Sequence, residues 1–377
     1  MAIDKVTSAA ITDGTITSSD LASGAVQNQS AFKNIIINGD MSIAQRSTSV
    51  SGIANGNGGY HTCDRWKYIE TGDTSVVFTQ SQSTDVPTGQ GFAKSLKLDC
   101  TTADASPGAS DTLRIAHCIE GQNLQYLKKG TSSAESTTVS FWVKATKTGT
   151  YIVQLKDKDN SNRFVSKAYT VSSSDTWEKK TLTFPGDTTG ALDNDNAKSL
   201  EVNFILLAGS DSTSGTLQET WGTLTTANQF VGQVNTFDST SNNWYITGVQ
   251  WETGTSASDF EFLPHDINLS RCERYCRLFG SGVQGRASNT TTFYFSEPMQ
   301  PAMRASPTLT LTDTSFGVGN YVSYDKQASG SSLQLARSSR TGIAGSADGF
   351  TGLTGSDQLQ VWYGLTSDTW LMVTAEL

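Results

Sequence analysis

Short runs of alternating apolar and polar residues, separated by polar turns, recur along this chain and constrain its fold more than any other feature. In residues 137–146 (TTVSFWVKAT), an apolar row alternates with a mixed row: Val139, Phe141 and Val143 against Ser140, Trp142 and Lys144. Residues 149–157, 199–209 and 242–254 show the same period of two. That period belongs to a β-strand with one buried face. Because no helical pattern separates these runs, they predict an antiparallel β-sandwich rather than an α/β fold.

Strict alternation also predicts which side chains share a face. Along residues 242–254, one face is expected to carry Trp244, Ile246, Gly248 and Gln250. The opposite face is expected to carry Tyr245, Thr247, Val249 and Trp251. Four tryptophans are expected on strands, in structural positions: Trp66, Trp142, Trp177 and Trp244.

The first 32 residues carry a different repeat. Apolar residues recur every five positions, at Val6, Ile11, Ile16, Leu21 and Val26, and small residues stand two positions before the last four. Neither a helix nor a strand has a period of five. Five such units cannot bury their apolar row alone, since repeat units need stacked neighbours. The repeat predicts a segment that winds with two other copies or docks on a partner; the alternative is a flexible linker.

One helix is expected, over residues 265–280. Its apolar seam is formed by Leu269, Cys272, Cys276 and Phe279, with Asp266 as the N-cap and Gly280 as the stop. It is either a helix that links two modules and packs on the sandwich, or a trimerising neck. The odd count of five cysteines, without the spacing of a disulfide scaffold, predicts reduced and mostly buried thiols.

These patterns define four segments of an all-β protein. They are an extended five-residue-repeat segment (1–32), a large jelly-roll-like antiparallel sandwich (33–264), a short linking helix (265–280) and a small C-terminal β-sandwich (281–377). Within the second segment, residues 35–37 are expected to form the first strand and to turn at residues 38–39.

Charge and hydropathy exclude several classes of partner. The formal net charge is −9, and the chain has no run of Lys or Arg, so it lacks the basic face of a nucleic-acid binder. No apolar stretch approaches the roughly 20 residues that span a bilayer, so membrane insertion is not expected. The N-terminus lacks the charged and apolar regions of a signal peptide, which favours synthesis in the cytoplasm and release by lysis.

No catalytic, cofactor or metal site is expected. Glu252 and Asp259 are the best carboxylate pair for a glycosidase, but the sequence does not bring them together. The three histidines, His61, His117 and His265, have no metal-ligand spacing. Residues 193–196 (DNDN) offer oxygen ligands for Ca²⁺ but lack the rest of an EF-hand loop, so a hairpin turn is favoured there.

Sugar binding requires an exposed aromatic side chain with polar groups beside it. Trp221 lies in a polar stretch rather than on an alternating strand, and Tyr60 follows two glycines. These two residues are the sequence-based candidates for glycan contact.

Several phrases of the sequence, in this order, resemble a module of tail-fibre and related appendage proteins of tailed bacteriophages. They include residues 34–46 (NIIINGDMSIAQR), 60–68 (YHTCDRWKY), 271–280 (RCERYCRLFG) and 301–307 (PAMRASP). The central part is similar to carbohydrate-binding modules of the jelly-roll type. This resemblance implies a virion tail fibre, a homotrimer that attaches to other phage tail or neck proteins through residues 1–32.

The expected function is therefore attachment to bacterial surface polysaccharide without catalysis. Three alternatives stay open: a purely structural adaptor or head/neck fibre that positions another receptor binder, a tail-associated polysaccharide hydrolase, and a bacterial carbohydrate-binding protein. The missing signal peptide and the N-terminal repeat count against the last of these.

Overall fold

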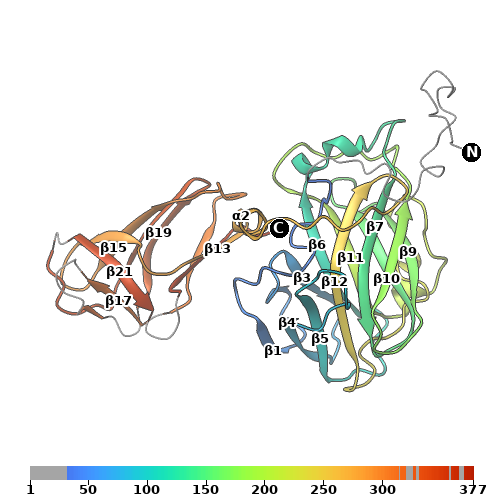
Figure 1. Ribbon diagram of the computed structural model, residues 1–377, viewed down its shortest axis with the longest axis horizontal. Coiled ribbons are helices and arrows are strands. Elements are labelled where there is room, and N and C mark those ends of the chain that lie inside the picture. The colour runs from blue at the N-terminus through green and yellow to red at the C-terminus, as the bar shows by residue number, and fades with distance from the viewer. Residues whose placement is uncertain (1–31, 314, 320–325, 328–330, 356–357, 365–368) are drawn as a thin grey trace, which may run out of the picture.

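The computed structural model describes residues 32–377 except 314, 320–325, 328–330, 356–357 and 365–368. The described chain forms two β modules joined by one helix (Figure 1). The predicted all-β fold is confirmed. The five-residue repeat lies outside the described residues, so the attachment or trimer-stalk segment stays a prediction.

The larger module is a sandwich of two antiparallel six-stranded sheets, here called sheet A and sheet B. Sheet A has the order β1 (Ser49–Ile53), β4 (Val77–Ser83), β5 (Ser95–Thr102), β12 (Asn243–Thr253), β7 (Thr137–Ala145), β10 (Glu178–Phe184). Sheet B has the order β2 (Gly59–Tyr60), β3 (Trp66–Thr71), β6 (Thr112–Glu120), β11 (Lys198–Ala208), β8 (Gly149–Asp157), β9 (Phe164–Val171). Successive strands cross repeatedly from one sheet to the other, so the core fills the space between two sheets assembled from distant parts of the chain.

The alternation in β7 is confirmed. Val139, Phe141 and Val143 belong to the core, whereas Trp142 points to the opposite face. In β12 the predicted alternation is correct only as far as Thr247.

A β-bulge after Thr247 changes the faces of β12. Gly248 adopts a left-handed φ of 61°, and two residues of β12 lie opposite one of β7 between the pairs Thr247↔Trp142 and Gln250↔Ser140. The extra residue turns Val249 and Trp251 into the core that already holds Trp244 and Ile246. Glycine suits this position because a Cβ there would lie 2.5 Å from the ring of Phe92.

Residues 35–37 are not a strand, although the sequence predicted one. Ile35 and Ile36 are buried in the core, and the Ile35 N–H donates to the Trp251 carbonyl at 2.9 Å. Asn38 then takes a left-handed φ of 58° and its amide bonds the carbonyls of Ile43 and Asp64 at 2.8 and 2.9 Å. The segment is fixed to the sandwich by these contacts rather than by a strand ladder.

The outer face of sheet B is partly covered by the long connection from β11 to β12. Phe230 of this connection packs on Ile152 and Ile205. The short helices of the sandwich are α1 (Ser210–Thr213) and the 3₁₀ turns η2 (Gly121–Asn123), η3 (Gln125–Leu127) and η4 (Thr226–Asn228).

The linking helix is shorter than predicted. Helix α2 spans His265–Glu273 with Pro264 at the N-cap, so the assignment of Asp266 as N-cap and of Gly280 as stop was wrong. Cys276 and Phe279 belong instead to β13 (Cys276–Phe279), because that segment pairs with β22 (Leu371–Thr374). All five cysteines are free and buried, as predicted.

The smaller module contains a three-stranded and a seven-stranded antiparallel sheet with a separate hydrophobic core. The first has the order β13, β22, β16 (Thr308–Leu311). The second has the order β18 (Lys326–Gln327), β17 (Phe316–Gly319), β21 (Gln358–Gly364), β14 (Gln284–Ala287), β15 (Phe293–Pro298), β20 (Gly342–Ala347), β19 (Leu333–Ser339).

The end of the chain returns to the sandwich and holds the two modules together. The Glu376 carboxylate pairs with Arg46 at 3.0 Å and with the fully buried Arg65. Arg304 donates to the carbonyls of Asn196 and Ala375 at 2.9 and 2.7 Å. These contacts bind the C-terminal residues and a loop of the smaller module to the larger one.

Candidate functional site

Three aromatic side chains lie on the outer face of sheet A, away from the core. Trp142 and Tyr245 are placed there by the alternation of β7 and β12. Trp177 directly precedes β10 rather than lying on a strand as predicted. All three are half-buried and none belongs to a hydrophobic core cluster. These residues, with Lys97, Lys144 and Asp85, are here called the aromatic patch.

Tyr245 is the centre of the patch. Lys144 and Lys97 stand opposite it on β7 and β5, with their Nζ atoms 4.3 and 5.6 Å from its ring centroid. The ring of Trp177 meets it edge to face with centroids 6.1 Å apart. Such cation–π and aromatic contacts hold the rings in fixed orientations.

Asp85 connects the charged and aromatic parts of the patch. It accepts a hydrogen bond from the indole Nε1 of Trp177 at 2.9 Å and forms an ion pair with Lys144. Burial acts to raise the pKa of Asp85, but the hydrogen bonds from Lys144 and Trp177 outweigh it, so the pKa lies below its usual value. Asp85 is therefore a carboxylate at neutral pH, and it orients both partners.

Trp142 occupies the neighbouring row of the same face. Its register partners are Thr247 on β12 and Lys179 on β10. Among the residues that the structure describes, none accepts a hydrogen bond from its indole N–H or stacks on its ring. A partly exposed indole offers an apolar face and a free donor, the combination that binding surfaces use.

The structure places the two sequence-based candidates elsewhere. Trp221 is half-buried against the core, donates from Nε1 to the Pro185 carbonyl at 2.8 Å and stands over Lys129. The hydroxyl of Tyr60 donates to the Leu377 carbonyl oxygen at 3.0 Å. Neither is an open platform, and the structure does not bring the two together with the aromatic patch.

Glu252 and Asp259, the carboxylate pair considered for a glycosidase, both take part in the hydrogen bonds of one turn. The Glu252 carboxylate is buried and accepts hydrogen bonds from the backbone and hydroxyl of Ser258 at 2.9 and 2.7 Å, within one turn. Asp259 contributes its backbone carbonyl to the same turn, as acceptor for Gln250.

In the loop of residues 193–196, considered above as a Ca²⁺ site, the polar groups form hydrogen bonds with the protein backbone and with a neighbouring side chain. The Asp195 carboxylate accepts the Ala197 N–H at 2.9 Å, and Asp193 N–H donates to Asp159 at 3.0 Å. Within the described ranges, no group of three or more His, Cys, Asp or Glu side chains is arranged to hold a metal ion.

Sequence reasoning missed the aromatic patch although it contained the necessary signal. The alternation in residues 137–146 already set Trp142 opposite the core row. Its position on a strand was interpreted as structural, but a strand has two faces, and the outward one remains available for binding. The convergence of Trp177 and Asp85 on Tyr245 could not be predicted, because it depends on strand order in sheet A.

Neither a scan against protein-family models nor a search of curated proteins found a match. Among solved structures, the chain is similar to the enzymatically active domain of tailspike protein 4 of bacteriophage CBA120 (16% identity, TM-score 0.31), covering 59% of this chain and 22% of that one. It is also similar to a structure described as CBM4 structure and function (12% identity, TM-score 0.29, 58% and 98% covered). A third is a family 11 carbohydrate-binding module of a cellulosomal cellulase of Clostridium thermocellum (10% identity, TM-score 0.26, 51% and 90% covered).

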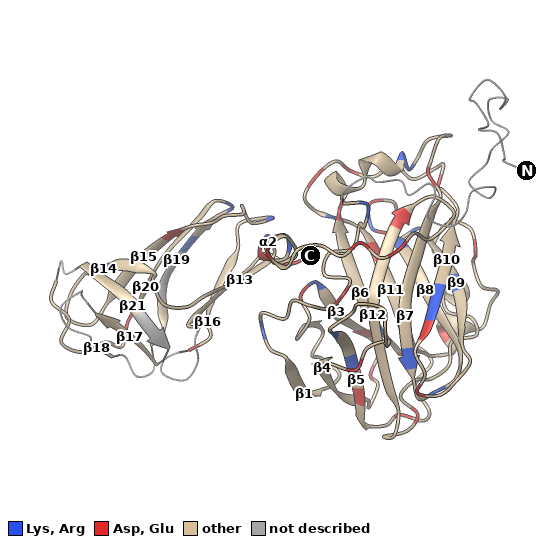
Figure 2. Ribbon diagram, in the orientation of Figure 1, with Lys and Arg blue, Asp and Glu red and all other residues tan. Residues whose placement is uncertain are grey.

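Because these TM-scores lie below 0.5, the similarities add nothing to what the sheets and side chains themselves establish. Charged residues of both signs are interspersed along the strands and loops of the sandwich (Figure 2). In the part of the chain that the structure describes, no helix is both long and apolar enough to cross a bilayer.

Proposed function

We propose that this protein is a non-catalytic glycan-binding component of a phage fibre, and that the aromatic patch on sheet A contacts the glycan. The observation that carries this proposal is the open position of Trp142 beside the Tyr245–Trp177 pair. The backbone of sheet A fixes the spacing of these rings before any ligand arrives. A preorganised site loses little conformational entropy on binding.

The chemistry of the patch suits a sugar chain. The face of Trp142 matches the apolar face of a pyranose ring, while Tyr245, Lys97, Lys144 and Asp85 supply donors and acceptors for hydroxyl groups. A sheet face is open at both ends, so it accommodates an internal stretch of a polymer rather than a single sugar. Bacterial surface polysaccharide is the polymer we propose.

The assembly proposal rests on the sequence. Residues 1–32 carry the five-residue repeat, and the phrases from residue 34 onward resemble phage fibre proteins. We propose that residues 1–32 associate three copies of the chain and attach them to other tail or neck proteins of a virion. Three weak sites on one fibre would then raise the effective affinity by avidity, without any new contact.

The test uses labelled full-length protein, intact host cells and their purified surface polysaccharide. We expect the Trp142→Ala variant to lose about tenfold in affinity, since one aromatic contact contributes on the order of 1–3 kcal/mol by analogy with base stacking. Trp221→Phe is a suitable control because it keeps a half-buried ring outside the patch. Unchanged binding by the Trp142→Ala variant would contradict the proposed site.

Two further readouts test the rest of the proposal. Release of reducing ends from the polysaccharide by the wild-type protein would contradict the non-catalytic role. Failure of the wild-type protein to bind any host would instead favour the structural adaptor. Light scattering that shows a single chain in solution would contradict the trimer.

A further inference from the structure

A cavity of about 360 Å³ lies at the junction between the sandwich and helix α2. It is bounded by residues 32–37, the end of β6, the turns η2 and η3, and the last turn of α2. Its volume is within the range of ~300–1,000 Å³ that small-molecule sites occupy. It shares no residue with the aromatic patch.

Arg271 of α2 supplies a cation with unused donors. Its only hydrogen bond to a described residue is a long one, 3.4 Å from Nη2 to the Asn34 carbonyl oxygen. Within the described residues, no carboxylate lies at ion-pair distance from it. By contrast, Arg274 on the same side of α2 forms a bidentate pair with Glu120 at 2.8 and 2.7 Å.

The environment of Arg271 makes this contrast informative. Burial lowers the pKa of its guanidinium, so the surroundings disfavour the charge that the side chain still carries. Most of its five N–H donors have no acceptor among the described residues. A partly buried arginine in this state favours a bound anion, since a carboxylate accepts two parallel N–H···O bonds.

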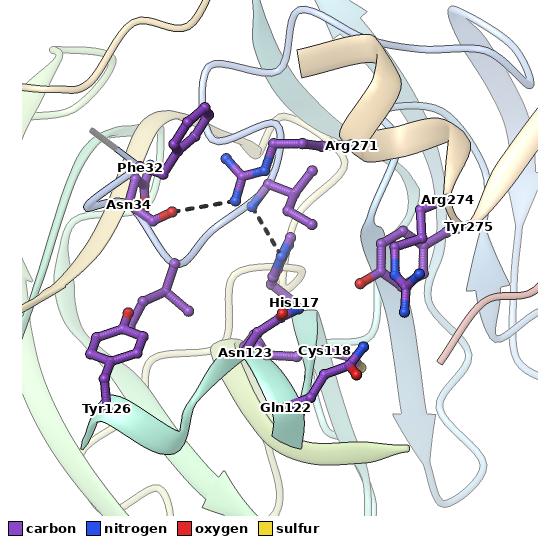
Figure 3. A pocket seen from close by; sticks show the side chains of 13 residues that line it. Phe32, Asn34, His117, Cys118, Gln122, Asn123, Tyr126, Arg271, Arg274 and Tyr275 are labelled. Carbon is purple, nitrogen blue, oxygen red and sulfur yellow. Dashed lines mark hydrogen bonds between the residues drawn. The ribbon is translucent and has the colours of Figure 1, made fainter. Parts of the chain in front are cut away.

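The opposite wall of the cavity is aromatic and amide-bearing. Figure 3 shows Phe32, Asn34 and Arg271 on one side and Tyr126, Asn123 and Gln122 on the other, with His117 between them. Tyr126 belongs to the short 3₁₀ turn η3 and is 48% exposed. An exposed ring opposite a guanidinium can cover one face of a ligand whose charged group reaches Arg271.

His117 forms the inner end of the cavity as a neutral side chain. It is fully buried, and its Nε2 accepts the Ile37 N–H at 3.3 Å. Burial, together with the charges of Arg65 and Arg271, holds its pKa well below the usual value. The proton therefore sits on Nδ1, which has no hydrogen-bond partner among the described residues. The cavity thus carries one positive charge without an ion-pair partner among the described residues, that of Arg271, on which the Glu261 carboxylate acts from a longer distance.

We propose that this cavity binds one acidic sugar unit, a hexuronic acid, with its carboxylate on Arg271. The ring then lies against Tyr126, and its hydroxyl groups meet the amides of Asn123 and Gln122. A single free cation matches a single carboxylate. A doubly charged phosphate fits less well, because the second cation beside the cavity, Arg274, is already paired with Glu120.

The test measures binding of methyl glucuronoside, methyl glucoside and acetate to the full-length protein by ligand-observed NMR and calorimetry. We expect methyl glucuronoside to bind at least tenfold more tightly than either of the others. The Arg271→Gln variant should lose about tenfold to hundredfold in affinity, as expected for hydrogen bonds to a charged group. The Tyr126→Ala variant should lose severalfold.

The control is Arg286→Gln, which removes the same charge from an exposed position of the smaller module. It should bind methyl glucuronoside like the wild type. Circular dichroism should show Arg271→Gln fully folded, because the only hydrogen bond lost is a long one.

Three results would overturn the proposal. They are glucuronoside binding that survives Arg271→Gln, acetate binding as tight as that of the glucuronoside, and equal binding of glucoside and glucuronoside. The Trp142→Ala variant separates this site from the aromatic patch, since it should bind the glucuronoside normally whether or not sheet A binds polysaccharide.

Discussion

The two β modules differ in how they use their aromatic side chains. In the smaller module, most of the large rings whose side chains the structure describes lie in the core, among them Phe293, Phe295, Phe316, Phe350 and Trp370. Among its described residues only Tyr294 is a large exposed aromatic, at 37%. The sandwich has a larger core of the same kind and still leaves Trp142, Trp177 and Tyr245 on an outer sheet face.

Strand length explains this difference. In the sandwich, β7 and β12 have 9 and 11 residues, so each supplies a full inward row and a full outward row. In the smaller module no described strand is longer than 7 residues, and β13, β16 and β17 have 4 residues each. A strand that short has two inward positions, and bulky residues are needed there to build any core. The longer strands of the sandwich have outward positions that the core does not need, and these can carry the aromatic side chains of a binding face.

The largest expected effects come from removing one large side chain from each core in turn. Trp244→Ala and Trp370→Ala each remove a fully buried indole, which costs about 3–5 kcal/mol in the free energy of unfolding. Because the cores are separate clusters, we expect Trp370→Ala to melt the smaller module and to leave polysaccharide binding by the sandwich intact. Calorimetry and binding assays on the same samples check this.

Loss of polysaccharide binding by a Trp370→Ala protein whose sandwich stays folded would contradict this difference between the modules. It would move the binding surface to the smaller module or to the junction. Trp244→Ala should give the opposite result, with binding lost together with the sandwich.

The next effect concerns the junction between the modules. Glu376→Gln leaves Arg65 fully buried without its carboxylate, although the Cys118 carbonyl at 2.7 Å and the Tyr275 ring 3.5 Å away remain. We expect a loss of about 3 kcal/mol in the free energy of unfolding, at the lower end of the values for breaking a buried ion pair. Urea denaturation measures it.

The control for that variant is Glu273→Gln, which breaks a more exposed pair with Arg277 at 3.7 Å. It should change stability by about 0–1 kcal/mol. Equal effects of the two substitutions would show that Glu376 does not hold the modules together.

The junction also shows where sequence reasoning stops. The alternation of β7 predicted its buried row because one face of a strand meets a core whichever strand pairs with it. The helix prediction was wrong beyond Glu273, because pairing with β22, nearly a hundred residues later, draws Cys276 and Phe279 into a sheet. A spacing of 3 and 4 cannot reveal that partner.

The sites show the same limit. The position of Trp142 on an outward face followed from the sequence, but its neighbours did not. Asp85, Tyr245 and Trp177 meet only because β5, β12, β7 and β10 are adjacent in sheet A. Arg271 gave no signal at all, since its lack of a carboxylate partner is a property of the folded junction.

A smaller loss of stability is expected when the pH is lowered, and it should affect the sandwich alone. His61 and His117 both have lowered pKa values through burial, and the sequence has no histidine after His265. A depressed histidine stays neutral in the folded state while the unfolded chain takes up a proton below about pH 6.5. Stability is therefore lost as the pH falls, by up to about 2 kcal/mol for His117 between pH 6.5 and pH 5.

Urea denaturation at pH 7 and pH 5 measures this loss, and His117→Gln isolates its source. The variant keeps an acceptor for the Ile37 N–H but does not titrate. Asp64 has a pKa raised by burial and acts in the opposite direction, so the difference between wild type and variant is the quantity to compare. An identical pH dependence in the two proteins would exclude His117 as the cause.

The smallest effect on folding is expected from two tyrosines outside the cores, one in each module. Tyr245→Ser and Tyr294→Ser each remove a ring that packs in no core cluster, so each should change the free energy of unfolding by about 1 kcal/mol or less. Their effects on polysaccharide binding should differ, because only Tyr245 stands between two lysines and beside Trp177. We expect about a tenfold loss of affinity for Tyr245→Ser and none for Tyr294→Ser. If the Tyr294 variant loses affinity instead, the short strands of the smaller module form the glycan surface, and the outward aromatics of sheet A serve another partner.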